Sequence, residues 1–237
     1  MNETITIGRT INAQGLPVEG SGVSLDLNSP TAKLLLAQDV VIISNPVTKE
    51  YGASIQVMNE RGESIEKGLG IIPPHSIGPP MHIHPNYDET FTVVEGAFEF
   101  ILNKKPIIIK EGETITVKRG ITHTFKSAEE NKVCSFLLEA NPEGKLNEVI
   151  RTIWGLAHDG KTNSKGQPKE FLQGIAIGNE LKDDTLFVSP PPFIQRFMFK
   201  LLGKTATKKG FKGIYDKYTD DSFWTSKVEQ SVKIMNY

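Results

Sequence analysis

The middle of the chain is a series of short β-rich segments separated by Gly, Pro and Asn, and this pattern limits the fold more than any other feature. Val, Ile, Thr and Phe dominate the segments, which is typical of strands. The predicted strands cover residues 40–44, 53–59, 68–73, 89–95, 97–102, 106–109, 114–117, 121–126 and 133–140. So many short strands within about a hundred residues predict an antiparallel β-sandwich or β-barrel.

The two flanks of this region have a different texture. Residues 1–39 mix glycine, serine and short apolar runs, with one short helix predicted at 31–38 after Ser29-Pro30, so we expect an arm there. In residues 141–237 apolar side chains recur at three- and four-residue spacing, which predicts helices near 146–157, at 169–181 and after Pro190-Pro191-Pro192. The sequence therefore predicts an arm (1–39), a β-domain (40–140) and a C-terminal helical extension (141–237).

The third predicted helix carries a pronounced apolar stripe. Its members are Phe193, Ile194, Phe197, Met198, Leu201 and Leu202. Such a stripe is typical either of an interfacial membrane anchor or of a helix docked on a core or a second subunit. We favour docking, because the basic residues on the polar face of the predicted helix are few.

Composition excludes several classes of partner. Lys and Arg number 27 against 28 Asp and Glu, so no overall field favours nucleic acid. The single cysteine, Cys134, lies in an apolar run and is predicted to be a buried thiol. The sequence shows neither a signal peptide nor a stretch long enough to span a bilayer. We therefore expect a cytoplasmic protein with neither nucleic acid nor membrane as partner.

Two histidines one residue apart, His82 and His84, are the clearest candidates for chemistry. On an extended segment, residues i and i+2 point to the same side, so both imidazoles share one face. Because imidazole is the commonest metal ligand, the pair predicts half of a metal site.

Strand alternation suggests a third histidine. His123 shares its strand face with Ile121 and Phe125, which marks that face as the apolar inner one. Gly112 and Gly120 bracket a strand and a turn that would bring His123 across the sheet toward the first pair. Three of the five histidines of the chain are then predicted to converge.

The same argument selects a carboxylate. Glu89 shares a strand face with Phe91 and Val93, whereas Asp88 lies on the opposite face. Glu89 is therefore the predicted ligand, and Asp88 is predicted to cap the turn.

The order and spacing of these residues match a known family. The segment His82-x-His84-x4-Glu89-x6-Gly96 is followed, after fifteen residues, by Gly112-x7-Gly120-x2-His123. This pair resembles the two signature motifs of the cupins over about residues 40–140. The resemblance implies a mainly β fold, a cupin-like antiparallel β-barrel (double-stranded β-helix or jelly roll), with a metal held inside by His82, His84, Glu89 and His123.

Three positions depart from the family pattern. Lys118 stands where the second motif usually has proline, and Ser127 where it usually has asparagine. Ser76 occupies the usual place of the glycine that opens the first motif, with Gly78 two residues on. None of the three is a metal ligand, so the departures concern the turns and not the predicted ligands.

Three neutral imidazoles and one carboxylate suit a divalent first-row transition metal such as Fe, Mn, Ni, Co, Cu or Zn. Such a set leaves one or two coordination positions open for a substrate, water or dioxygen. Ligand type does not select among these metals. The alternative is a metal-free cupin whose histidines only form hydrogen bonds.

Parity also predicts the side chains around the site. The predicted substrate pocket consists of Phe91, Val93, Phe98, Phe100, Ile121 and Phe125. An interior of this kind suits an apolar or aromatic small molecule. Alternatively, the phenylalanines only fill a small barrel.

We expect a metal-dependent oxygenase acting on a small organic molecule, with Glu89 as ligand and catalytic proton acceptor, a role that the cupin resemblance implies. A non-oxidative isomerase or lyase and a non-catalytic binding module are the alternatives, because cupins do all of these things. We also expect a homodimer, with the N-terminal arm crossing between subunits.

Three further side chains are assigned structural roles. His75 is predicted to be a solvated loop residue, and His158 a cation at the C-terminal end of a helix. Tyr87 is predicted to lie on the surface between the ligands, the alternative being a proton donor at the pocket mouth.

Overall fold

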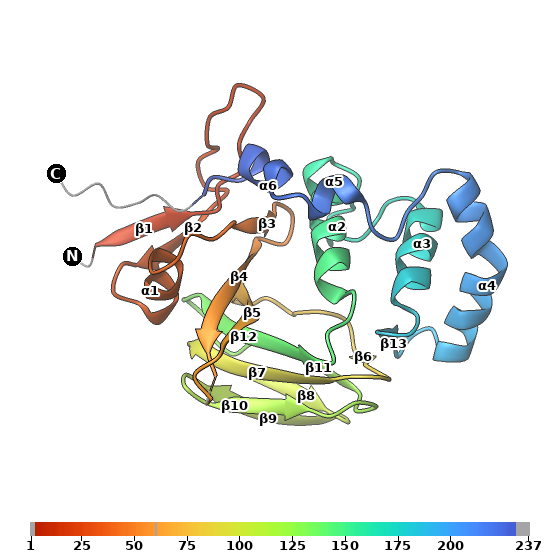
Figure 1. Cartoon of the computed structure of the whole chain (residues 1–237), viewed down its shortest axis with the longest axis horizontal. Helices are drawn as coiled ribbons and strands as arrows, with labels where there is room; N and C mark the ends of the chain where they lie inside the picture. The colour runs from red at the N-terminus through yellow and green to blue at the C-terminus, as the bar shows by residue number, and fades with distance from the viewer. Residues whose placement is uncertain (1–2, 60, 231–237) are drawn as a thin grey trace.

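The computed structural model describes residues 3–59 and 61–230, and it arranges the β-rich middle of the chain in two antiparallel sheets (Figure 1). The six-stranded sheet has the order β10 (Thr114–Val117), β7 (Asp88–Glu95), β12 (Cys134–Asn141), β5 (Ser64–Ile72), β4 (Glu50–Met58) and β3 (Ile43–Asn45). The five-stranded sheet has the order β13 (Leu186–Phe187), β6 (His82–Ile83), β11 (His123–Ser127), β8 (Ala97–Leu102) and β9 (Lys105–Lys110).

The main core of the β-domain lies between these sheets. Alternate residues of β7 and β8 are buried, as expected for strands with one face on a core. Side chains from both sheets form one buried cluster of Ile72, Phe91, Val93, Phe98, Phe100, Ile109, Val117, Phe125, Cys134 and Phe136. The antiparallel sheets confirm a mainly β fold, while closure into a barrel stays a prediction.

The N-terminal region contains two strands that the sequence analysis missed. β1 (Thr4–Ile7) pairs with β2 (Val23–Asp26), and α1 (Pro30–Leu36) follows, capped by the Ser29 side chain. A second core cluster joins these elements to β3, β4 and β5 and to Trp224 of α6 (Asp221–Lys227). The N–H of Gly8 donates to the carbonyl of Glu229 at 3.2 Å. The arm thus packs on the described part of its own chain, and its crossing to a partner stays a prediction.

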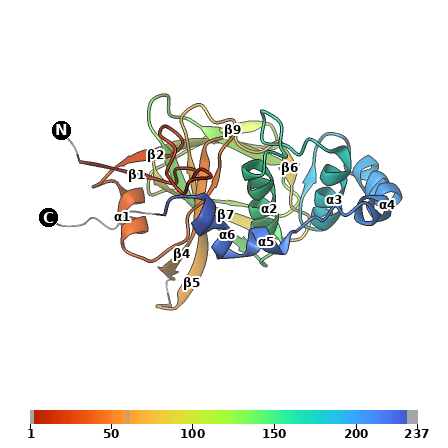
Figure 2. The same ribbon diagram turned by 90° about the horizontal axis from the view of Figure 1, so that it is seen from above.

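The C-terminal extension is helical, as predicted, and lies along one side of the β-domain (Figures 1 and 2). The three predicted helices are α2 (Leu146–His158), α3 (Phe171–Leu181) and α4 (Pro192–Lys208). The short helices α5 (Asp216–Thr219) and α6 were missed, because four and seven residues give too little periodicity to detect. In the described part of the chain, no helix is long and apolar enough to cross a membrane.

Several predicted strand boundaries were inaccurate. The strand predicted at 40–44 lies at Ile43–Asn45, and the one predicted at 121–126 begins only at His123. The two-residue strands β6 and β13 were not predicted, because they exist only through pairing with other segments. These two strands matter most for the site.

Candidate metal centre

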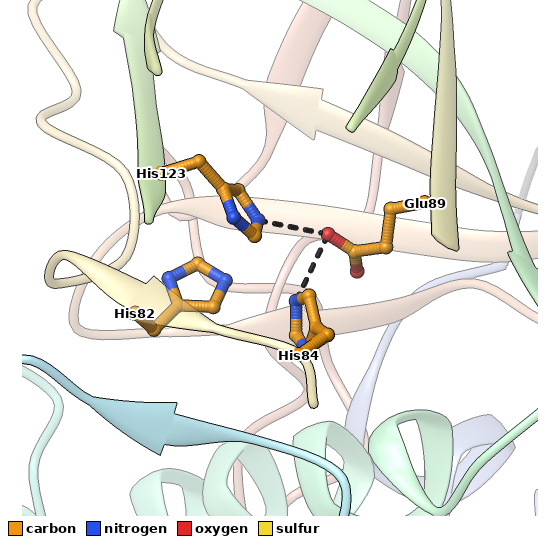
Figure 3. Close-up of side chains that lie close together, drawn as sticks. All are labelled: His82, His84, Glu89 and His123. Atoms are coloured by element: carbon orange, nitrogen blue, oxygen red, sulfur yellow. Dashed lines mark hydrogen bonds and ion pairs between the residues drawn. The ribbon is translucent and has the colours of Figure 1, made fainter. Parts of the chain in front are cut away.

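The four predicted ligands lie together at one end of the β-domain, and their side chains point toward one another (Figure 3). His82 belongs to β6, His84 directly follows it, and His123 begins β11, so all three come from the five-stranded sheet side. Glu89 comes from β7 of the six-stranded sheet. One potential ligand atom of each residue lies within 4.8 Å of the others. The cluster therefore joins the two sheets.

Strand pairing explains why the histidines meet. His82 of β6 stands directly opposite His123 of β11, and the centroids of their rings are 4.2 Å apart. His84 lies two residues after His82, and its ring centroid is 4.8 Å from that of His82 and 5.0 Å from that of His123. Because His82 and His123 are partners across the sheet and His84 lies two residues after His82, the three imidazoles share one face.

The carboxylate of Glu89 makes the closest contacts in the cluster. Its Oε2 lies 3.0 Å from Nε2 of His84 and 3.0 Å from Nε2 of His123. His123 and Glu89 are 1% and 2% exposed, so water does not screen these contacts. Four ionisable groups are thus held together out of solvent, an arrangement that needs compensating charge.

Backbone carbonyls fix the outer nitrogen of every imidazole. Nδ1 of His82 faces the carbonyl of Pro80 at 2.8 Å, and Nδ1 of His123 faces that of Ile121 at 3.0 Å. Nδ1 of His84 lies 3.0 Å from the carbonyl of Asp184. A carbonyl only accepts, so each Nδ1 carries the proton and donates it. In a neutral ring, Nε2 then presents a lone pair to the cluster.

With this tautomer, the three Nε2 atoms and the carboxylate of Glu89 can all bind one cation. Nε2 of His84 is buried and has no hydrogen-bond partner of acceptable geometry, although Glu89 Oε2 lies 3.0 Å away. Three nitrogen lone pairs facing a carboxylate repel one another unless a cation or protons lie between them. Imidazole nitrogens whose other ring nitrogen is fixed by a carbonyl are typical ligands of divalent transition metals.

The pKa values of two cluster residues depend on positive charge inside the cluster. Burial by itself would raise the pKa of Glu89, but hydrogen bonds from His123 and His84 and their positive charge outweigh burial and lower the pKa to about 2. A bound cation would supply that positive charge where Nε2 carries a lone pair. Burial, followed by the charges of His123 and His84, lowers the pKa of His82 to about 4. At neutral pH Glu89 is therefore ionised and His82 neutral, the forms that bind metal.

The helical extension contributes to the site in a way that sequence reasoning missed. The segment after α3 pairs with β6, with Phe187 opposite His82. The hydroxyl of Thr185 lies 3.1 Å from Nδ1 of His84, beside the carbonyl of Asp184. Residues from the extension therefore orient one predicted ligand and cover the edge of the strand that carries another.

Tyr87 is buried at 2% exposure, so its predicted place on the surface was wrong. Its ring stacks on His84 with centroids 4.3 Å apart, and its hydroxyl lies 3.4 Å from that of Thr185. Burial raises the pKa of Tyr87, and the negative charge of Glu89 raises it further, so the phenol stays protonated. The tyrosine supports His84 from the side of the extension.

The predicted pocket residues occupy the core beside the site. Phe91, Val93, Phe98, Phe100 and Phe125 are buried in one cluster with Phe136, and Ile121 is partly buried against it. The rings of Phe91 and Phe100 lie 5.0 Å apart, and those of Phe125 and Phe136 lie 5.2 Å apart. These side chains fill the space between the sheets, and their role in binding a substrate stays a prediction.

The turn before His123 uses Lys118, one of the three residues that depart from the cupin pattern. Asp88 accepts a hydrogen bond from the backbone N–H of Arg119 at 2.9 Å and one from Nζ of Lys118 at 3.0 Å. Asp88 therefore caps the turn that precedes His123. The chain passes β11 at Gly78, where an added Cβ would lie 2.0 Å from the carbonyl oxygen of Phe125.

The remaining candidates lie outside the cluster. His75 is exposed in a loop, as predicted, and Cys134 is a buried thiol. His158 does end α2, but burial lowers its pKa to about 4, so it is neutral rather than a capping cation at neutral pH. Its Nε2 donates to the carbonyl of Ser44 at 3.1 Å.

Comparison with known proteins identifies the β-domain. A family model described as a cupin domain matches residues 68–138, which include all four clustered residues. None of the curated proteins matches the chain.

Similar solved structures include KdgF from Halomonas sp., which is 17% identical, with 38% of this chain and 76% of that chain covered at a TM-score of 0.30. A sugar phosphate isomerase from Silicibacter pomeroyi is 21% identical, with 37% and 57% covered at a TM-score of 0.30. A predicted oxalate decarboxylase from Thermotoga maritima is 20% identical, and the match covers 43% of this chain and 90% of that chain at a TM-score of 0.32. Residues 68–138 of this chain form a cupin domain, because the family model, the two antiparallel sheets and the two sequence motifs all agree.

Proposed function

We propose that this protein binds one divalent first-row transition metal through Nε2 of His82, His84 and His123 and the carboxylate of Glu89, and that it is a metal-dependent oxygenase acting on a small organic molecule. The observation that carries the metal assignment is the fixed tautomer of all three histidines. Each Nδ1 is turned to a backbone carbonyl, so three Nε2 atoms are directed at one buried carboxylate.

Such an ion would supply open positions for a substrate or for dioxygen, the chemistry of an oxygenase or of a Lewis-acid isomerase or lyase. The chain's own residues hold the site rigid and dry. The four side chains are each at most 7% exposed, and the phenylalanine cluster lies beside them. Exclusion of water protects reactive intermediates, which favours the oxygenase over the alternatives.

Glu89 has two roles in this proposal. Its carboxylate is the single negative charge among the four ligands, so it offsets part of the charge of a divalent ion. It is also the group of the cluster that would accept a proton from a substrate. Phe91, Val93, Phe98, Phe100, Ile121 and Phe125 form the apolar surroundings in which an apolar or aromatic substrate would bind.

Elemental analysis of protein produced without added metal tests the first half of the proposal. We expect about one equivalent of a transition metal per chain in the wild type and its loss in His82→Ala and Glu89→Ala. Asp88→Asn is the matched control, because it removes the neighbouring charge on the opposite strand face while its side-chain oxygen still accepts from the N–H of Arg119. Wild-type protein without stoichiometric metal would contradict both the oxygenase and the Lewis-acid assignments.

Oxygen consumption tests the second half. The metal-loaded protein is assayed against flavonoids, catechols, diketones and thiols, with Glu89→Ala as the control. Turnover without oxygen consumption would replace the oxygenase by an isomerase or lyase. Tight ligand binding without any turnover would leave a binding module.

We also propose a homodimer in solution. The mass of one chain is 26.2 kDa, so light scattering distinguishes one chain from two directly. A single species of about 26 kDa at all concentrations would contradict the dimer.

A further inference from the structure

The outer face of α4 carries a row of large apolar side chains that no described residue covers. Phe193, Phe197 and Leu201 are 73%, 65% and 62% exposed. They are spaced four residues apart, so they form one ridge along the helix. The sequence analysis expected this stripe to be docked, and within this chain the ridge is open to solvent.

The opposite face of α4 explains why the ridge is left outside. Ala206 and Gln195 are buried at 0% and 4% exposure, and the Gln195 side-chain amide donates to the carbonyl of Phe187 at 2.6 Å. Ala206 forms an apolar cluster with residues of α3. The helix is thus attached through one side, and its free side faces away from the body of the protein.

A row of cations runs beside the apolar ridge. Arg196, Lys200, Lys204 and Lys208 are also spaced four residues apart, three residues after the members of the ridge, and all four are exposed. The helix sequence contains no Asp or Glu. Across the described residues, none of the ion pairs involves these four cations. Four unpaired cations on one helix contrast with the net charge of −1 for the whole chain.

This combination selects one kind of partner. Exposed aromatic and aliphatic side chains beside a basic row are the features of helices that lie in the plane of a membrane interface. Anionic headgroups attract each juxtamembrane Lys or Arg, and the apolar ridge inserts at the boundary of the acyl chains. A second copy fits less well, because a symmetric contact through this face would bring two rows of cations together.

The position of α4 permits contact with a flat surface. The helix forms the outermost element at the end of the molecule opposite β1 and α1 in two perpendicular views (Figures 1 and 2). We propose that the outer face of α4 is a peripheral docking surface for anionic lipid bilayers. For this face, the proposal replaces our expectation from sequence that the protein has no membrane partner. The sequence analysis favoured docking over a membrane anchor because basic residues were few, but α4 carries Arg196, Lys200, Lys204 and Lys208.

Vesicle co-sedimentation tests the proposal with the full chain. The probes are phosphatidylcholine vesicles and vesicles in which one lipid in three is phosphatidylglycerol. We expect at least ten-fold more protein to sediment with the anionic vesicles, and the difference to disappear at high salt because salt screens the headgroup charge. Equal binding to both vesicles, or binding to neither, would overturn the proposal.

Two pairs of variants separate the apolar and basic contributions. Phe193→Ser/Phe197→Ser should lose vesicle binding, whereas Phe171→Ser, at a side chain 61% exposed outside α4, should retain it. Lys200→Glu/Lys204→Glu should also lose binding, whereas the equally charged Lys105→Glu/Lys165→Glu should retain it. All these positions are exposed, so the fold is preserved. Self-association that the first double variant abolishes, without vesicle binding by the wild type, would assign the face to a second copy and overturn the lipid proposal.

Discussion

The backbone carbonyl of Asp184 lies 3.0 Å from Nδ1 of His84, although 100 residues of chain separate the two. Asp184 belongs to the helical extension and His84 to the cupin domain. This contact fixes the ring orientation and the tautomer of a proposed metal ligand. The extension is therefore part of the proposed metal centre and not an appendage to it.

We predict that Thr185→Val weakens metal binding by about ten-fold, because its hydroxyl is the second group beside Nδ1 of His84. The measurement is a metal titration in competition with a chelator. Thr185→Ser keeps the hydroxyl and is the matched control. Equal affinities in the wild type and Thr185→Val would show that the carbonyl of Asp184 alone orients His84.

Removal of metal with a chelator should lower the melting temperature of the wild type by about 10 °C. A ligand at 1,000 times its Kd stabilises the folded state by about 4 kcal/mol. In a chain of this size, each kcal/mol changes the melting temperature by about 2–4 °C. Calorimetry of chelated and reloaded protein gives the value. Glu89→Ala should show almost no shift, and a shift as large as that of the wild type would contradict the role of Glu89 as a ligand.

Stability should fall between pH 7 and pH 4, partly through His158. Burial lowers its pKa from an ordinary 6.5 to about 4, so in this range the unfolded chain binds a proton that the folded chain does not. Each such proton makes unfolding easier as the pH falls, and the effect ends below about pH 4. The contribution of His158 is at most about 3.4 kcal/mol, since each pKa unit between about 6.5 and about 4 is worth about 1.36 kcal/mol.

Urea unfolding of the wild type and His158→Gln at several pH values measures this term. The variant should lose less stability between pH 7 and pH 4, while His82 contributes equally to both proteins. Parallel pH profiles would show that the pKa of His158 is the same in the folded and the unfolded chain.

Gly78→Ala should destabilise the protein by more than about 3 kcal/mol. Its φ is +60°, which costs an L-residue about 1–2 kcal/mol, and the new Cβ would meet the carbonyl of Phe125 at 2.0 Å. Gly62→Ala is the matched control, since its φ is +75° with nothing within 4 Å of the added Cβ. Equal losses of unfolding free energy in the two variants would mean that the close approach to Phe125 has no energetic effect.

Phe98→Ala should cost about 3–5 kcal/mol of unfolding free energy, because Phe98 is 0% exposed in the core between the sheets. Phe171→Ala, at an exposed position, should change stability by less than about 0.5 kcal/mol. The metal content of Phe98→Ala should stay that of the wild type. A variant of normal stability would contradict the tight packing of Phe98 in this core.

The alternation of side chains along a strand explains why the sequence correctly predicted which residues point into the domain. The choice of Glu89 over Asp88 follows from parity alone, and the structure turns Glu89 inward and Asp88 toward Lys118 and Arg119. His123 was expected to lie across the sheet from His82, and the two are direct partners in the ladder. Local periodicity determines these features, so they are visible in the sequence.

The missed features depend on contacts between distant segments. Tyr87 is buried because Thr185 and the rest of the extension pack over it, and nothing near Tyr87 in the sequence signals this. The strand β13 has two residues and exists only through its pairing with β6. The contact of Gly8 with Glu229 likewise joins opposite ends of the described chain, and no local pattern signals it.

The contact between Asp184 and His84 also determines when, during synthesis of the chain, the proposed metal site can be completed. His84 is synthesised 100 residues before Asp184, the residue whose carbonyl orients it. At about 5–20 residues per second, several seconds pass between the two. During that interval the nascent cupin domain has all four proposed ligands but lacks the group that orients His84. Metal capture in the final geometry therefore has to wait until the extension is made.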